Sequence, residues 1–166
     1  GVLHSGIYYK PGSLKAINCR AGKAAMEAFC REHSVPFEIC GKVIVAVDES
    51  ERARLPALLD RGKQNGVACR RIGAEELRER EPHAAGTEAI LIPETGIVDY
   101  RAVCAKLAKI LTARGASIVF GARVTALRGG VVTSTAGETE ARVVVNCAGL
   151  FSDRVARSAG ARLDAR

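Results

Sequence analysis

The stretch Val-Val-Val-Asn-Cys-Ala-Gly-Leu-Phe-Ser-Asp, residues 143–153, decides the fold class that we expect for this chain. Its run of three valines is typical of a strand that is buried on both faces of a parallel sheet. Gly149 allows the backbone to turn tightly after such a strand, and Ser152 or Asp153 can cap a helix that follows at once. A strand end beside a helix N-terminus presents free N–H groups and a positive dipole end to an anion. We therefore expect one half of a dinucleotide pocket here.

The other half of such a pocket is a Gly-x-Gly-x-x-Gly turn after an N-terminal strand. This pattern does not occur in the 166 residues. We therefore interpret the chain as part of a flavin enzyme rather than as a complete one. The N-terminal residues lack the pattern of a signal peptide, and every apolar run is shorter than the ~20 residues of a membrane span. We expect a location in the cytoplasm or at the periphery of a membrane.

Composition and charge narrow the class of protein further. Hydrophobic residues make up 48% of the chain, which is enough for a packed core and too many for a disordered protein. The formal net charge is +7, but the basic residues between positions 52 and 80 alternate with acidic ones. This dispersal favours a solvated surface, or an anionic cofactor and an anionic substrate, over a nucleic-acid partner.

The six cysteines are scattered, and no two of them are separated by two residues. That spacing excludes a zinc knuckle and a thioredoxin-like redox pair, so we assign no metal site. Scattered thiols usually act as small buried apolar side chains in a reducing compartment, and we expect the same here.

Apolar spacing and capping residues predict the order of the elements along the chain. A helix is expected over residues 14–31 after Ser13, and a second one over 100–114 after Asp99. We expect the remaining elements to be strands at 42–47, 67–72 and 89–93, helices after 48–50 and from 73, and short strands at 117–120, 123–127, 131–135 and 141–146.

This order predicts an α/β fold in which a second, mainly antiparallel domain interrupts a parallel nucleotide-binding sheet. We place residues 1–35 and 99–166 in the nucleotide-binding part and residues 36–98 in the inserted part.

Four segments resemble a known family, the FAD-dependent oxidoreductases of the D-amino-acid oxidase/glycerol-3-phosphate dehydrogenase superfamily. Within that superfamily the chain is most similar to the L-2-hydroxyglutarate oxidase/dehydrogenase family. The segments are GVLHSGIYYKPGSLK at 1–15, EELREREP at 75–82, GIVDYR at 96–101 and NCAG at 146–149. The resemblance implies part of an FAD-binding Rossmann-like domain with an inserted, mainly antiparallel α+β substrate domain. It also implies oxidation of a small anionic 2-hydroxy acid, L-2-hydroxyglutarate, to 2-oxoglutarate, with FAD as cofactor.

The resemblance places the first loop against the flavin ring, with Ser5 and Gly6 as cofactor contacts. His4 would then accept the hydroxyl proton while a hydride leaves the substrate for the flavin. Tyr8, Tyr9 and Lys10 would orient a dicarboxylate, because a bound anion needs paired donors. From the residues alone, His4 could equally hydrogen-bond only to the backbone or the cofactor, Tyr8 and Tyr9 could pack, and Lys10 could be solvated.

Three residues of the second half are also expected to contact FAD. The resemblance places the backbone of Val124 at the adenine ring, although a valine in a strand is by default a core residue. Ala148 and Gly149 are small enough for a phosphate or a ribityl chain to approach closely. Tight packing of a helix on a strand would explain the same two residues.

Two alternatives remain open at this point. A sister chemistry of the superfamily would act on glycerol-3-phosphate or on an amino acid. A different class is a non-catalytic piece without the glycine-rich FAD turn, which would self-associate through open sheet edges. The sequence does not decide between oxygen and a quinone as the electron acceptor.

Overall fold

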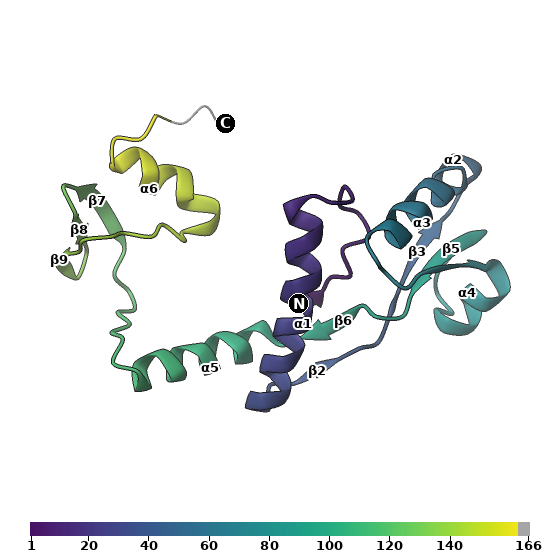
Figure 1. Cartoon of the computed structure of the whole chain (residues 1–166), viewed down its shortest axis with the longest axis horizontal. Coiled ribbons are helices and arrows are strands. Elements are labelled where there is room, and N and C mark those ends of the chain that lie inside the picture. Colours follow the sequence, from purple (N-terminus) through teal and green to yellow (C-terminus); the bar gives the residue numbers. More distant parts are fainter. Residues whose placement is uncertain (163–166) are drawn as a thin grey trace. The chain divides into compact units, whose positions relative to one another are not determined.

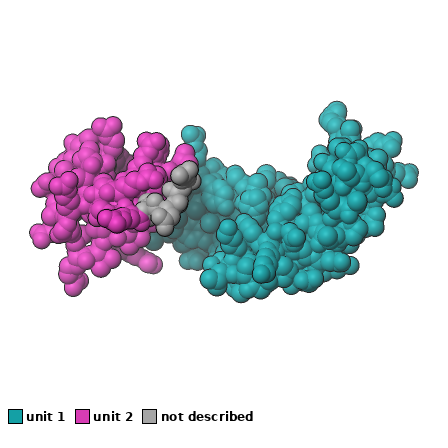
Figure 2. Space-filling view, turned by 90° about the horizontal axis from the view of Figure 1, so that it is seen from above, with its two compact units in different colours: residues 1–113 teal, residues 114–166 magenta. Residues whose placement is uncertain are grey.

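The computed structural model describes residues 1–162 and contains two compact units (Figures 1 and 2). The first unit spans Gly1–Ala113, and the second begins at Arg114. All strand pairs in the described residues are antiparallel. The last four positions of the expected segment 99–166 lie outside the described residues.

The first unit contains two three-stranded antiparallel sheets. One sheet has the order β1-β6-β2, formed by Val2–Leu3, Gly96–Val98 and Phe37–Glu38. The other has the order β3-β5-β4, formed by Lys42–Ala46, Glu88–Ile92 and Arg70–Gly73. Strand β4 lies closer to the C-terminus than the strand that we predicted at 67–72. Val67 belongs to the loop before β4, and its side chain packs in the core.

Strand β5 is the centre of the second sheet, and all of its residues are buried. Ile90 and Ile92 belong to one apolar core, while Ala89 and Leu91 belong to another. This division follows from the strand geometry, because successive side chains point to opposite faces of a sheet. A strand covered on both faces has no polar face, which is why residues 89–92 of β5 are a continuous apolar run after Glu88.

Helices complete the first unit: α1 (Leu14–His33), α2 (Glu49–Arg52), α3 (Leu55–Gln64), α4 (Ala74–Arg80) and α5 (Tyr100–Ala113). The predicted caps of the two longest helices are confirmed. Ser13 Oγ accepts a hydrogen bond from the N–H of Ala16 at 3.3 Å, and Asp99 Oδ1 accepts one from the N–H of Arg101 at 2.9 Å. No helix within residues 1–162 is both long enough and apolar enough to cross a membrane.

The helix that we predicted after residues 48–50 is divided into α2 and α3. Asp48 caps α2 as predicted, and its carboxylate accepts a hydrogen bond from the N–H of Glu51 at 2.9 Å. Helix α3 then begins afresh at Leu55 with Pro56 in its first turn. Proline has no N–H to donate, so it fits the first turn of a helix and not the interior.

The second unit holds a three-stranded meander, β7 (Val124–Arg128), β8 (Val131–Ser134) and β9 (Gly137–Glu140). Gly129 and Gly130 join the first two strands, and both have positive φ, 56° and 83°. Two such residues form the tight hairpin turn that the Gly-Gly pair predicts. A single 3₁₀ turn, Gly149–Phe151, leads into α6 (Ser152–Ser158), which packs against β7.

Two of the four short strands that we expected in this half are absent from the structure. Residues 117–120 form no strand, and Phe120 is 85% exposed. Residues 141–146 likewise form no strand, and Val143 and Val145 are more than three-quarters exposed. A strand is stable only when a neighbour satisfies its N–H and C=O groups, and no described strand pairs with this segment.

Two local expectations of the sequence are also wrong. Neither Ser152 nor Asp153 caps the helix after the turn, because the 3₁₀ turn comes first and the Ser152 hydroxyl donates back to the Gly149 carbonyl at 2.7 Å. The cysteines are not uniformly buried. Cys30 is buried, Cys19 and Cys69 are half-buried, and Cys40, Cys104 and Cys147 are exposed.

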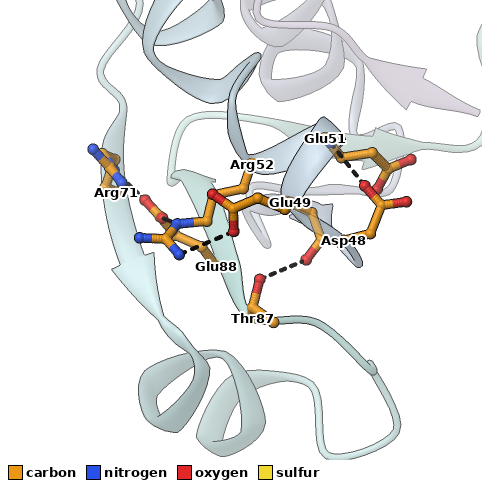
Figure 3. Close-up of polar contacts among 8 residues, drawn as sticks. Asp48, Glu49, Glu51, Arg52, Arg71, Thr87 and Glu88 are labelled. Carbon is orange, nitrogen blue, oxygen red and sulfur yellow. Dashed lines mark hydrogen bonds and ion pairs between the residues drawn. The ribbon is translucent and has the colours of Figure 1, made fainter.

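Two carboxylates of the first unit are each held by a pair of arginines (Figure 3 shows one of them). Glu88, on β5, accepts hydrogen bonds from Arg71 and from Arg52, the latter at 3.1 Å. Glu76, on α4, accepts hydrogen bonds from Arg70 at 2.8 Å and from Arg80 at 3.0 Å. These ion pairs tie α2 and α4 to the β3-β5-β4 sheet.

Acid should weaken this unit through the same two carboxylates. Hydrogen bonds from Arg70 and Arg80 lower the pKa of Glu76 from 4.5 to about 2, and those from Arg71 and Arg52 lower the pKa of Glu88. Because each pKa is lower in the folded state, the stabilisation is present above pH 4.5 and is lost as the pH falls toward 2. We expect the urea midpoint to decrease over this range.

Glu76→Gln and Glu88→Gln should each reduce that pH dependence and lower the midpoint at neutral pH. Glu79→Gln is the control, since Glu79 is exposed and forms no ion pair within residues 1–162. If the urea midpoint depended on pH equally in all three variants, Glu76 and Glu88 would not be the source of the acid sensitivity.

Candidate functional site

The loop between β1 and α1 carries most of the residues that the sequence singles out in the first unit. The residue before the loop and one residue within it are fixed in different cores. Leu3 is 3% exposed and packs with Cys30, Val35, Val98 and Val103. Ile7 is 1% exposed and packs with the residues of α3 and of the β3-β5-β4 sheet. The short segment between these two anchors, which begins with His4, has little freedom to move.

Close packing against α3 holds the second anchor. Gly62 lies under Ile7, and a Cβ added at this glycine would come within 3.0 Å of Ile7 Cγ1 and 2.8 Å of Cys69 Sγ. Contacts that short would force the loop or the helix to move. The absence of a side chain at position 62 therefore sets how closely the loop lies on the helix.

Hydrogen bonds from the end of α3 fix the loop backbone. Asn65 Nδ2 donates to the carbonyl of Gly6 at 3.1 Å and to that of Tyr9 at 2.9 Å. Arg61 Nη1 donates to the carbonyl of Tyr8 at 3.3 Å. Gly6 adopts φ +91°, and its own carbonyl also accepts from the N–H of Tyr9. Three carbonyl groups of the turn, those of Gly6, Tyr8 and Tyr9, are thus held by residues at the end of α3.

Helix α1 holds the other end of the turn. The Cys19 thiol donates to the carbonyl of His4 at 3.4 Å. Burial raises the pKa of this thiol, and the nearby Arg20 and Lys23 act in the opposite direction. A raised pKa keeps the sulfur protonated, as a donor must be. An open hollow of about 440 Å³ lies next to this region, lined by residues of α1 and by Asn65.

The loop has an exposed face and a buried face. His4 and Lys10 are exposed, Tyr8 is 51% exposed and Tyr9 is half-buried. An imidazole, two phenols and an ammonium group are therefore presented by one short turn. Such a set can accept a proton and can donate hydrogen bonds to carboxylates.

Ser5 and Gly6 form the buried face of the same loop. Ser5 is 2% exposed, and its hydroxyl has no hydrogen-bond partner in the part of the chain that the structure describes. A contact between either residue and a flavin therefore needs a local shift of the loop.

The second unit carries the other three predicted contacts. Val124 begins β7 and is 40% exposed, and Ala148 and Gly149 are exposed as well. Gly149 adopts φ +55°, and an added Cβ would meet no atom within 4 Å. All three residues leave space for a ligand without rearrangement.

Asn146 shapes the turn in which two of these contacts lie. Its Oδ1 accepts from the N–H of Ala148 at 3.1 Å, and its Nδ2 donates to the carbonyl of Ser152 at 2.8 Å. The side chain thus spans the connection into α6. This bridge explains the asparagine of the Asn-Cys-Ala-Gly segment without any ligand.

Three residues next to the first loop were missed by the sequence analysis. Lys42 Nζ lies 4.7 Å from the centre of the Tyr8 ring, and Arg61 and Asn65 bind the loop carbonyls. Asn65 stands in an Asn-Gly pair, which is typical of the end of a helix. The Asn-Gly pair predicts where α3 ends. It does not indicate which carbonyl groups the amide of Asn65 binds.

Comparisons with known proteins identify relatives of this chain. The family model described as FAD dependent oxidoreductase matches residues 1–166. The L-2-hydroxyglutarate dehydrogenase of Escherichia coli O17:K52:H18 is 46% identical over 165 residues, covering 96% of this chain and 39% of that protein. The mitochondrial L-2-hydroxyglutarate dehydrogenase of Homo sapiens is 39% identical over 183 residues and is covered to 40%. The chain thus spans about two-fifths of the length of these relatives.

Solved structures show the same fold at lower identity. Glycine oxidase from Geobacillus kaustophilus superimposes with a TM-score of 0.87 at 23% identity, over 98% of this chain and 47% of that one. The FAD-bound L-alpha-glycerophosphate oxidase from Mycoplasma pneumoniae gives 0.85 at 24% identity, over 97% and 46%. The expected α/β architecture of flavin oxidases is confirmed.

The amide of Asn65 should be the main polar support of the first loop. Asn65→Ala removes two hydrogen bonds to loop carbonyls, and we expect the free energy of unfolding to decrease by about 1–3 kcal/mol. Urea unfolding measures this loss. Gln64→Ala is the matched control, because Gln64 is the exposed neighbour in the last turn of α3. An equal loss in both variants would show that the loop does not depend on the amide.

Proposed function

Because the chain belongs to the family of FAD-dependent oxidoreductases, we propose that it is part of an enzyme that oxidises a 2-hydroxy acid with FAD. The substrate that we propose is L-2-hydroxyglutarate, and the product is 2-oxoglutarate. The observation that carries this proposal is the identity of 39–46% to proteins named L-2-hydroxyglutarate dehydrogenase, over almost the whole chain. The exposed side chains of the first loop support it.

The proposed chemistry removes two electrons and two protons from the substrate. FAD, when bound, supplies the acceptor for the hydride that leaves the α-carbon. His4 accepts the hydroxyl proton as the C–O bond becomes a carbonyl. Tyr8, Tyr9 and Lys10 orient the carboxylates of the substrate through hydroxyl and ammonium donors. The rigid loop keeps these groups in fixed positions relative to one another.

Three exposed residues support the proposed FAD contacts of the second unit. Val124, Ala148 and Gly149 are exposed, and the open space at Gly149 lets a phosphate or a ribityl chain come close to the backbone. We retain Ser5 and Gly6 as proposed contacts of the first unit; both are buried in this structure.

We also propose the division into domains that the sequence predicted. Residues 36–98 contain the whole antiparallel β3-β5-β4 sheet with α2, α3 and α4, which supports their assignment to an inserted substrate domain. Residues 1–35 and 99–166 would belong to the FAD-binding domain. The cytoplasmic or membrane-peripheral location, the choice of oxygen or a quinone as acceptor, and self-association of the piece stay predictions.

Flavin retention and reduction test the proposal directly. A longer protein that contains this chain should show flavin absorbance bands after gel filtration, and L-2-hydroxyglutarate should bleach them without another reductant. Glycerol-3-phosphate and an amino acid are the comparison substrates, and faster bleaching by either would assign the sister chemistry. A protein that binds no flavin would contradict the proposal. The 166-residue chain, mixed with FAD in parallel, shows whether it binds the cofactor by itself.

His4→Asn tests the proposed base. We expect kcat for L-2-hydroxyglutarate to decrease roughly 10²- to 10⁴-fold, which is the usual contribution of a positioned general base, while the flavin spectrum stays unchanged. His83→Asn is the control, because His83 is an exposed residue of the first unit outside this loop. An unchanged kcat in His4→Asn would assign this histidine to the support of the loop alone.

A further inference from the structure

Lys42 is placed over an exposed aromatic ring of the first loop. It begins strand β3, is half-buried, and holds its Nζ 4.7 Å from the centre of the Tyr8 ring. The carbonyl of the same tyrosine accepts a hydrogen bond from Arg61 at 3.3 Å. Two cationic side chains, from β3 and α3, therefore meet at one residue of the loop.

Several arginines of the first unit are paired with glutamates, and the cations near this tyrosine are not paired with a carboxylate in the described residues. Arg20, Arg52, Arg70 and Arg71 each form an ion pair with a glutamate. Within residues 1–162, Lys10, Lys42 and Arg61 form no ion pair with a carboxylate. Positive charge gathered at Tyr8 without a carboxylate partner fits an anionic ligand.

The ring also restricts the movement of the lysine. A flexible ammonium group loses conformational entropy when it is fixed on a ligand, and contact with an aromatic face already removes part of that freedom. Lys42 is therefore preorganised to bind an anion that reaches the exposed side of Tyr8. A carboxylate there would pair with the ammonium group and accept a hydrogen bond from the phenol.

We propose that Lys42, held on the Tyr8 ring, binds the carboxylate that lies farther from the reacting carbon of a dicarboxylate substrate. This role rests on the proposed function, since a 2-hydroxydicarboxylate has one carboxylate beside the oxidised carbon and a second at the other end. It makes Lys42 a specificity-determining residue that separates dicarboxylates from 2-hydroxy acids with an apolar tail.

Steady-state kinetics of the longer flavin enzyme test this role with two substrates of equal chain length. L-2-hydroxyglutarate has the distal carboxylate, and L-2-hydroxyvalerate has a methyl group in its place. Lys42→Gln should raise KM for the dicarboxylate about 10- to 100-fold, the effect of losing one charge-assisted hydrogen bond. Values of kcat for the dicarboxylate and of kcat/KM for the monocarboxylate should change less than about threefold. Lys42→Arg should restore most of the loss, because it keeps the charge.

The control is Lys109→Gln, which removes the same charge from an exposed position of α5, and it should leave both substrates unaffected. An equal loss on both substrates in Lys42→Gln would show that Lys42 only supports the loop, and an unchanged KM would show that it contacts neither substrate. Either result overturns the inference while the proposed function stands. A wild-type enzyme with no turnover of L-2-hydroxyglutarate overturns both.

Discussion

The start of the loop between β1 and α1 joins two apolar cores, and the candidate site depends on this constraint. Leu3 is buried against α1 and α5, and Ile7 is buried against α3 and the β3-β5-β4 sheet. Four peptide units join two fixed points, so His4 and its neighbours cannot relax independently of either core. The amide of Asn65 adds hydrogen bonds where the apolar contacts end. Rigidity of this kind is what a site needs in order to keep reacting groups in register.

Some cations of the first unit are paired with carboxylates, and two cations beside the candidate site are not paired in the described residues. Glu76 and Glu88 neutralise the arginines that join α2 and α4 to the sheet, and these pairs support the architecture. Lys42 and Arg61 meet at Tyr8 without such partners in the described residues. Both cations contact the loop that carries an imidazole and two phenols.

The sequence predicted well what depends on neighbours along the chain. Helices α1 and α5 were found because apolar spacing and the caps Ser13 and Asp99 are local signals. The strand at 141–146 was predicted wrongly, because three valines show only that a segment is suited to pairing, and the partner decides whether a strand forms. Lys42 and Arg61 were missed for a related reason. Their contacts with Tyr8 join residues more than thirty positions apart, and no pattern in either segment indicates the other.

Close packing at Gly62 also limits how this protein can diverge in sequence. The space between α3 and the loop is shared by Ile7, Gly62 and the sulfur of Cys69, with none left for another methyl group. A larger residue at position 62 becomes acceptable only if position 7 or 69 becomes smaller in the same lineage. The three positions should therefore vary as one inherited set, and the size of a residue at one of them carries information about the other two.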